Sequence, residues 1–177
     1  MKNIIFNLSL LLSILCKLSC TAQNYHRQDP DADKFAGTWK WGNQINGLVL
    51  ILKKENDVVM FKNDNSTFDI LIGFHKIYKN GLMIEDATMY NNTDFIDKKN
   101  TINARTETGT NINDPNKLSA VLTHKNKGIR IIIEYLDLNH IKIIGVENIG
   151  GTRLILPGQT APSSAIDIPN NITLTRQ

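Results

Sequence analysis

Residues 68–84 read FDILIGFHKIYKNGLMI, and this stretch decides the fold class. Every second residue in its first half is large and apolar: Phe68, Ile70, Ile72 and Phe74. The residues between them include a carboxylate, a glycine and a histidine: Asp69, Gly73 and His75. A period of two with one apolar face predicts a β-strand over residues 68–78. The turn signal Lys79-Asn80-Gly81 then leads into apolar residues 82–84, so the stretch predicts a β-hairpin.

Short apolar runs separated by turn signals continue on both sides of this hairpin. They cover residues 48–52, 58–61, 118–122, 129–135 and 141–144. Residues 87–117 are rich in Asn, Thr and Asp, which predicts long loops around one weak strand near residues 101–106. Residues 157–169 predict another loop, and residues 170–176 predict a closing strand. Because no segment after residue 37 shows a helical apolar stripe, we expect an all-β antiparallel meander that closes as a barrel, or alternatively a β-sandwich.

The composition indicates one globular domain, since the chain has 177 residues, of which 41% are hydrophobic and 21% are charged. Removal of a leader that contains Lys2 and Lys17 reduces the 20 basic residues to 18 against 17 acidic ones, a net charge of only +1. A nucleic-acid-binding domain carries a clear basic excess, so we expect no nucleic-acid partner. Cys16 lies in the same leader, so we expect no internal disulfide.

The N-terminus has the pattern of a secretory signal peptide. Lys2 supplies the positive charge, and residues 4–15 supply an apolar stretch that is too short for a membrane-spanning helix. Leu18-Ser19-Cys20 resembles a bacterial lipobox, although Lys17 departs from that pattern. Cleavage before Cys20, with lipidation of its thiol, is therefore one expectation. Cleavage after Ala22, which satisfies the small-x-small rule, is the other.

The chain is expected to divide into three parts. Residues 1–19 form a signal peptide that is removed, residues 20–32 form a flexible tether, and residues 33–177 form a single β domain. The protein is then exported, either as a lipoprotein of the cell envelope or as a secreted or periplasmic protein. A lipid on Cys20 is the only membrane contact that we expect.

No motif in the chain predicts catalysis, a cofactor or a metal ion. Residues 145–152 come close to a phosphate-binding P-loop but lack its lysine and its following helix. The histidines lie far apart in sequence, which favours surface or strand-edge positions over a metal site: His26, His75, His124 and His140. Two pairs of acidic residues lie beside turns, where such residues are ordinary: Asp94 with Asp97, and Glu85 with Asp86.

Residues 33–41, DKFAGTWKW, resemble the opening of lipocalin-type barrels. The resemblance implies a helical turn before Gly37, which leads into the first strand, and it implies that Trp39 plugs the closed end of the barrel. An arginine from the far end of such barrels stacks on this tryptophan, and Arg176 is the candidate here. Trp41 shares a strand face with Trp39 by its spacing. It either joins the interior or reaches the rim, where it is the candidate ligand contact.

A longer resemblance is to an uncharacterised family of small exported proteins from flavobacteria. The shared motifs are Ser-Cys-x-Ala-Gln at 19–23, Lys-Phe/Tyr-x-Gly-Thr-Trp-Lys at 34–40, Leu-x-Leu-Lys-Lys at 50–54, Asp-Ile-Leu-Ile-Gly running into Lys-Asn-Gly at 69–81, and Pro-Asn-Asn-Ile-Thr-Leu-Thr at 169–175. The resemblance implies export and a common fold. It implies no activity, because none is known for the family.

Two functional hypotheses follow for such a barrel. The first is a non-catalytic binding module whose barrel mouth accepts a small or lipidic ligand. The alternative is a surface interaction protein that grips a protein or glycan partner through residues 87–117. An enzyme assembled from distant carboxylates and histidines is a third, less favoured hypothesis.

Overall fold

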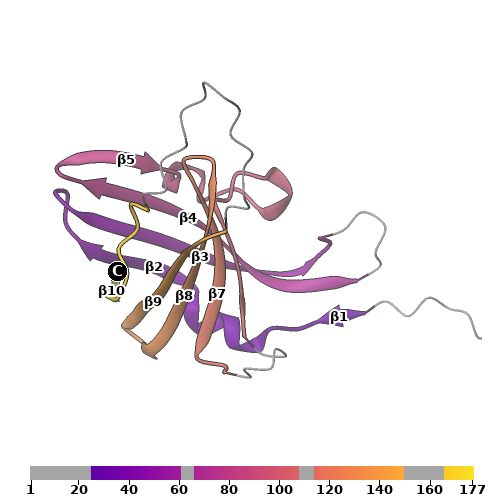
Figure 1. Ribbon diagram of the computed structural model, residues 1–177. Helices are drawn as coiled ribbons and strands as arrows, with labels where there is room; N and C mark the ends of the chain where they lie inside the picture. The colour runs from indigo at the N-terminus through magenta and orange to yellow at the C-terminus, as the bar shows by residue number, and fades with distance from the viewer. Residues whose placement is uncertain (1–24, 61–65, 108–113, 150–165) are drawn as a thin grey trace, which may run out of the picture.

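In the computed structural model, the described residues are 25–60, 66–107, 114–149 and 166–177, and they form an all-β barrel (Figure 1). Eight antiparallel strands close the barrel: β2 (Gly37–Gly42), β3 (Gly47–Val58), β4 (Thr67–Lys79), β6 (Ile102–Thr106), β7 (Lys117–His124), β8 (Lys127–Asp137), β9 (His140–Asn148) and β10 (Ile172–Arg176). Two further strands and three 3-10 helices complete the described elements: β1 (His26–Arg27), β5 (Leu82–Asp86), η1 (Pro30–Phe35), η2 (Thr88–Tyr90) and η3 (Phe95–Asp97). Among these elements, none of the helices has the length and hydropathy that a membrane span requires.

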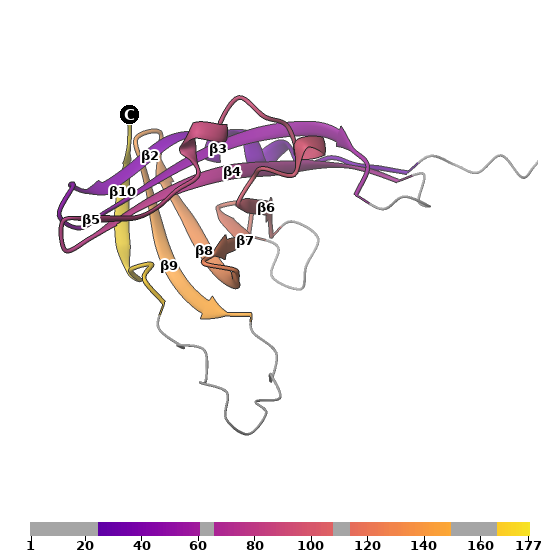
Figure 2. The same cartoon turned by 90° about the horizontal axis from the view of Figure 1, so that it is seen from above.

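Two pairings turn the meander into a closed barrel. β10 pairs with β2, which joins the end of the chain to the first barrel strand, and β4 pairs with β6. β4 is long enough to pair along one edge with β1, then β6, then β5, while β3 occupies its whole opposite edge. β3 and β4 therefore reach past the other barrel strands on the side of β1 (Figure 2). The predicted all-β barrel is confirmed, as are the predicted hairpin, which is β4 with β5, and the predicted weak strand, which is β6.

Inward-facing aliphatic side chains fill the barrel. Alternate residues of the strands are fully or almost fully buried and form one cluster, which includes Leu48, Leu50, Leu52, Leu71, Ile102, Leu118, Leu122, Ile129, Ile131, Ile133, Ile141, Ile143 and Leu174. This alternation follows from the period of two in a strand whose one face is removed from water. The core is therefore the barrel interior itself.

β4 is buried on both faces, which corrects the sequence-based expectation of one buried face. The apolar residues of the predicted face are buried or partly buried, but they lie on the outer wall of the barrel and not in its interior: Phe68, Ile70, Ile72 and Phe74. There they form an outer cluster with Val58, Ala87 and Phe95. The face expected to be polar points into the barrel and carries Leu71 and Ile77. The sequence of β4 is almost continuously apolar for this reason, as in strands that are covered on both sides.

The closed end of the barrel is built around Trp39. Its indole Nε1 donates a hydrogen bond of 2.8 Å to the carbonyl oxygen of Phe35 in η1, and the side chain is fully buried. The guanidinium of Arg176 lies over the indole, 4.2 Å from the ring centroid, and donates to the carbonyl oxygens of Ala36 and Leu138. Gly37 has φ +138°, and a Cβ at this position would lie 2.5 Å from Arg176 Nη1. Glycine is therefore required here both for backbone conformation and for space.

The described part of the expected tether, residues 25–32, contacts the barrel wall. Residues 26–27 form β1, and the carboxylate of Asp29 is buried, where it accepts hydrogen bonds from the backbone N–H and the hydroxyl of Thr106. Ala32 is also fully buried. Asp29 uses its polar side chain to bind the barrel wall. The amino-acid composition of the segment does not show whether its polar side chains bind the barrel or water. Residues 20–24 lie outside the described residues.

Candidate metal centre at the barrel mouth

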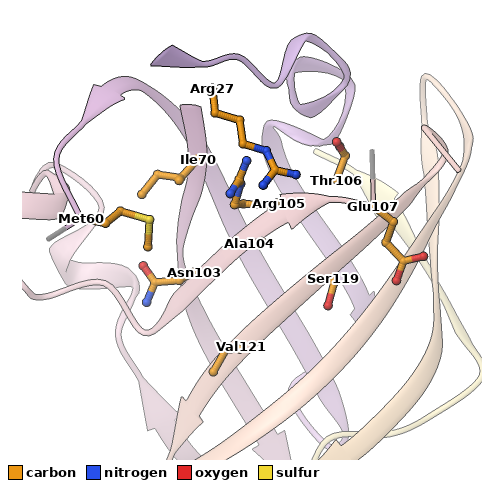
Figure 3. Close-up of a pocket in the computed structure, with 10 residues that line it drawn as sticks. All are labelled: Arg27, Met60, Ile70, Asn103, Ala104, Arg105, Thr106, Glu107, Ser119 and Val121. Carbon is orange, nitrogen blue, oxygen red and sulfur yellow. The ribbon is translucent and has the colours of Figure 1, made fainter. Parts of the chain in front are cut away.

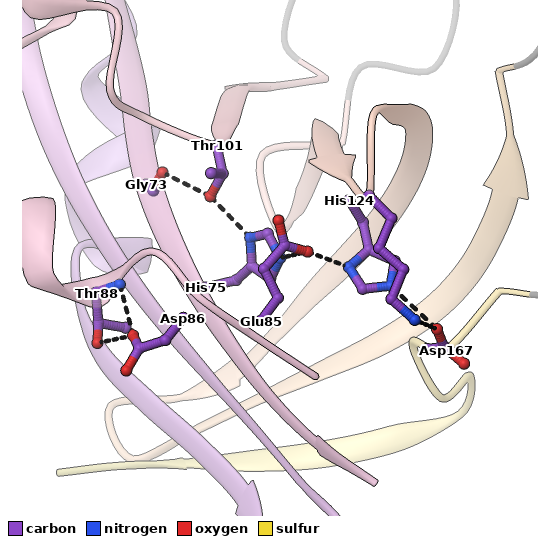
Figure 4. A network of polar contacts seen from close by, with 9 residues as sticks. Gly73, His75, Glu85, Asp86, Thr88, Thr101, His124 and Asp167 are labelled. Atoms are coloured by element: carbon purple, nitrogen blue, oxygen red, sulfur yellow. Dashed lines mark hydrogen bonds and ion pairs between the residues drawn. The ribbon is translucent and has the colours of Figure 1, made fainter. Parts of the chain in front are cut away.

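Three side chains from three strands meet at one end of the barrel (Figure 4): His75 from β4, Glu85 from β5 and His124 from β7. We call them the mouth cluster. Asp167 lies beside His124 and precedes β10, whereas Arg176, at the other end of β10, covers Trp39. The mouth cluster therefore lies at the end of the barrel that Trp39 does not close.

The donor atoms of the mouth cluster converge on one point. His75 Nε2 lies 3.1 Å from Glu85 Oε2, and His124 Nδ1 is in still closer contact with the same oxygen. The three donor atoms all lie within 4.8 Å of one another. Both imidazoles are buried, while the Glu85 side chain is 28% exposed and faces solvent. An ion would therefore reach the cluster past Glu85.

Each imidazole is also held through the nitrogen that faces away from Glu85. His75 Nδ1 lies 2.7 Å from Thr101 Oγ1, and this hydroxyl lies 3.5 Å from the carbonyl oxygen of Gly73. His124 Nε2 lies 3.2 Å from Asp167 Oδ2. Metal-binding histidines in proteins are oriented in the same way, by a carboxylate, hydroxyl or carbonyl on the second ring nitrogen.

Asp167 is a charged acceptor. Lys125 Nζ and Lys79 Nζ each lie 2.7 Å from its carboxylate oxygens, and their hydrogen bonds hold the pKa of Asp167 far below its usual range. An ionised carboxylate can only accept, so His124 Nε2 carries the proton of this contact. When the His124 ring is neutral, its Nδ1 lone pair then faces Glu85.

His75 is set up in a similar way. Burial lowers the pKa of His75, an effect that the charge of Glu85 only partly offsets, so the neutral ring is favoured at neutral pH. When the Thr101 hydroxyl donates to Gly73 O, His75 Nδ1 donates to Thr101, and the His75 Nε2 lone pair faces Glu85. Three electron-rich atoms then meet in a partly buried place. A cation between them, either a proton or a metal ion, relieves that repulsion.

The structure corrects the placement of two histidines. His75 and His124 are fully buried and converge, although the sequence predicts surface or strand-edge positions for them. His26 and His140 do lie near the surface, where they contact Asp57 and Asp137, respectively. The alternation of faces along each strand could have predicted the burial of His75 and His124, because each lies an even number of positions from inward-facing residues. His75 has the parity of the inward-facing Leu71 and Ile77, and His124 follows a buried series: Leu118, Ala120 and Leu122.

The acidic pairs found in the sequence do not act as pairs. Glu85 points into the mouth cluster, whereas Asp86 forms an ion pair of 2.8 Å with Lys76 and accepts hydrogen bonds from Thr88. Burial by itself raises the pKa of Asp86, but these hydrogen bonds outweigh it and the pKa is lowered. Asp94 and Asp97 instead form a reciprocal capping box at the start of η3, in which each side chain accepts a hydrogen bond from the backbone N–H of the other residue.

The other candidate residues are dispersed. Trp41 is partly buried and packs against the barrel core, and it also lines a small pocket of about 180 Å³ with Lys40 and Tyr78. Cys20 lies outside the described residues. Residues 145–148 continue β9, with an irregularity in pairing near Gly145, and residues 150–152 are outside the described part of the chain.

The two larger pockets lined by described residues lie outside the barrel. The interior is occupied by the buried aliphatic cluster, and two pockets of about 430 and 440 Å³ open on the outer surface. Residues 87–117 are not one free loop, because they include η2, η3 and β6, and Ala87 and Phe95 cover the outer wall of β4. Met89 and Ile96 in this segment remain exposed.

Comparison with known proteins assigns a family and leaves the activity open. No curated protein and no solved structure matches the chain. A family model described as "Family of unknown function (DUF6705)" matches residues 1–177. This agrees with the expected membership of an uncharacterised family. The chain therefore belongs to the family of unknown function DUF6705.

Proposed function

We propose that the protein is an exported, non-catalytic binding module that holds a divalent transition-metal ion at the barrel mouth. One observation carries the proposal: the donor atoms of His75, Glu85 and His124 lie within 4.8 Å of one another, and both imidazoles are oriented through their second nitrogens. In a tetrahedral zinc site, bonds of about 2.0–2.2 Å place neighbouring donors roughly 3.3–3.6 Å apart. The observed separations of at most 4.8 Å are somewhat longer than this range at their upper limit, so metal binding requires the donors to move closer together.

The donor set selects the class of metal ion. Two imidazole nitrogens and one carboxylate oxygen suit zinc and its neighbours in the first transition row, whereas calcium and magnesium require sites made of oxygen. Three protein donors leave one position of a tetrahedral ion for water or another small ligand. The partly exposed Glu85 lies on the solvent side of the cluster, which is consistent with exchange of the ion with solution.

Titration of the purified mature protein with zinc, after removal of metal by a chelator, tests the proposal. We expect one zinc ion per chain. Loss of a residue that only hydrogen-bonds to a metal ligand weakens metal binding by up to roughly 100-fold. Because Glu85 would itself be a ligand, Glu85→Gln should weaken zinc binding by at least about 100-fold. Asp86→Asn is the matched control, because Asp86 is adjacent in sequence but pairs with Lys76. Similarly, His124→Gln should abolish tight binding, while His140→Gln should leave it unchanged.

The outcomes separate a metal site from a proton site. Glu85 is partly exposed, so Glu85→Gln should stay folded in a thermal melt, and its loss of affinity is then a property of the site. Absence of zinc binding to the wild type would mean that a shared proton is the cation of the cluster, and it would overturn the proposal. Equal losses in Glu85→Gln and Asp86→Asn, or a preference for calcium over zinc, would do the same.

Export and lipidation are part of the proposal and rest on the leader. A short apolar stretch after Lys2 and the lipobox-like Leu18-Ser19-Cys20 support them. Labelled palmitate should enter the wild-type protein in bacterial cells, and Cys20→Ala should abolish the labelling. An exported protein whose N-terminus is Gln23 would show instead that cleavage follows Ala22 and that no lipid anchor is made.

A further inference from the structure

The outer wall of the barrel carries a pocket that is separate from the mouth cluster (Figure 3). Its volume is about 430 Å³, and residues of β1, β4, β6 and β7 line it. The lining residues that matter here are Arg27, Met60, Ile70, Asn103, Arg105 and Val121. The pocket thus combines two cationic side chains with an apolar wall.

The two guanidinium groups lie close together. Figure 3 shows the side chains of Arg27 and Arg105 directed toward each other at one side of the pocket. Arg105 lies over the ring of Phe68 at 5.2 Å, which fixes the plane of its guanidinium, and its Nε is buried with no hydrogen-bond partner. Burial, and then the charge of Arg27, lower the pKa of Arg105, and the charges of Asp29 and Asp69 offset only part of this effect. An anion placed between these groups would accept their hydrogen bonds and reduce their mutual repulsion.

The remaining lining residues narrow the class of ligand. Met60 and Val121 are 37% and 42% exposed, and together with Ile70 they form an apolar wall next to the arginines. The carboxylate of Glu107 also lines the pocket but lies apart from the two guanidinium groups in Figure 3. A purely inorganic anion would leave the apolar wall in water, whereas an aliphatic acid would cover it.

We propose that this outer pocket binds an aliphatic carboxylate, with its carboxylate on Arg27 and Arg105 and its alkyl chain along Met60, Ile70 and Val121. A bidentate contact between guanidinium and carboxylate matches the planar geometry of both groups. The ligand lies on the outside of the barrel, and the packed interior stays as it is. The site is independent of the metal site at the barrel mouth.

Octanoate is the probe, and its uncharged counterpart octanol and inorganic phosphate are the comparison ligands. We expect the mature protein to bind octanoate in calorimetry or by chemical-shift changes, and to bind octanol and phosphate at least about tenfold more weakly. Arg105→Gln should weaken octanoate binding by about tenfold or more, because it removes charge-assisted hydrogen bonds. Lys142→Gln is the control, since Lys142 is a cationic residue of β9 that does not line the pocket.

A second variant keeps the test decisive if Arg105→Gln fails to fold. Val121 is exposed, so Val121→Asp should preserve the fold while placing a carboxylate against the ligand, and it should also abolish octanoate binding. Glu85→Gln should leave octanoate binding unchanged, which separates this site from the metal site. No binding of octanoate to the wild type, equal binding of phosphate, or an equal loss in Lys142→Gln would each overturn the proposal.

Discussion

Replacement of Trp39 by alanine is expected to lower the free energy of unfolding by about 3–5 kcal/mol, the usual range for a buried tryptophan. The indole is fully buried, donates to Phe35 and lies under Arg176, so its loss removes packing on both sides at once. It also leaves the guanidinium of Arg176 without its aromatic partner. Urea denaturation of the two proteins measures the difference.

Trp41→Ala is the control for this prediction. Trp41 is on the same strand but only partly buried, so its replacement should cost clearly less than that of Trp39. Acrylamide quenching of the two single-tryptophan variants gives a second measurement, in which Trp39 should be protected. If Trp39 were quenched as freely as an exposed indole, the closed end described above would be wrong.

Ile72→Ala is expected to cost about 2–5 kcal/mol, although Ile72 lies outside the barrel. The side chain is fully buried because it packs in the outer cluster under residues 87–97. Lys79→Ala, in the same strand, should cost no more than about 1 kcal/mol, because its ion pair with Asp167 involves a half-exposed lysine. Chemical denaturation of both variants, with the wild type, provides the comparison.

The outer cluster is tested separately by Phe95→Ala. Phe95 belongs to the covering segment and packs against the same cluster as Ile72, so its removal should destabilise the protein and expose the outer wall of β4. Equal stability of Ile72→Ala and Lys79→Ala would contradict the burial of Ile72 in the outer cluster. It would mean that residues 87–97 do not cover β4 in solution.

The strands could be predicted from the sequence because their signals are local. Alternation over residues 68–78, with the Lys79-Asn80-Gly81 turn, was enough to predict β4 and the hairpin that follows. The two buried faces of β4 could not be predicted in the same way. One depends on the barrel interior, and the other depends on residues 87–97, a segment distant in sequence and rich in Asn, Thr and Asp. Alternation shows that two faces differ, but it does not show what covers each of them.

The candidate site could not be predicted, although its residues could have been placed on inward faces. His75 and His124 are 49 positions apart in sequence, and they meet only because β6 pairs with both β4 and β7. β6 itself follows a polar segment, and the length of this segment does not determine the register in which β6 pairs with β4. Trp39 and Arg176 were named through the resemblance to lipocalin-type barrels, since no local pattern joins two residues so far apart.

The pairing of β10 with β2 sets the order in which the protein can fold. Arg176 binds the carbonyl oxygen of Ala36, a contact that spans 140 residues, and β10 follows the other described barrel strands in the sequence. The barrel therefore cannot close before β10 has been synthesised, and the nascent chain stays open until then. If the protein is exported as proposed above, this open form is the one that passes through a translocation channel. It is also the form that a truncation before residue 172 would leave permanently, with Trp39 uncovered.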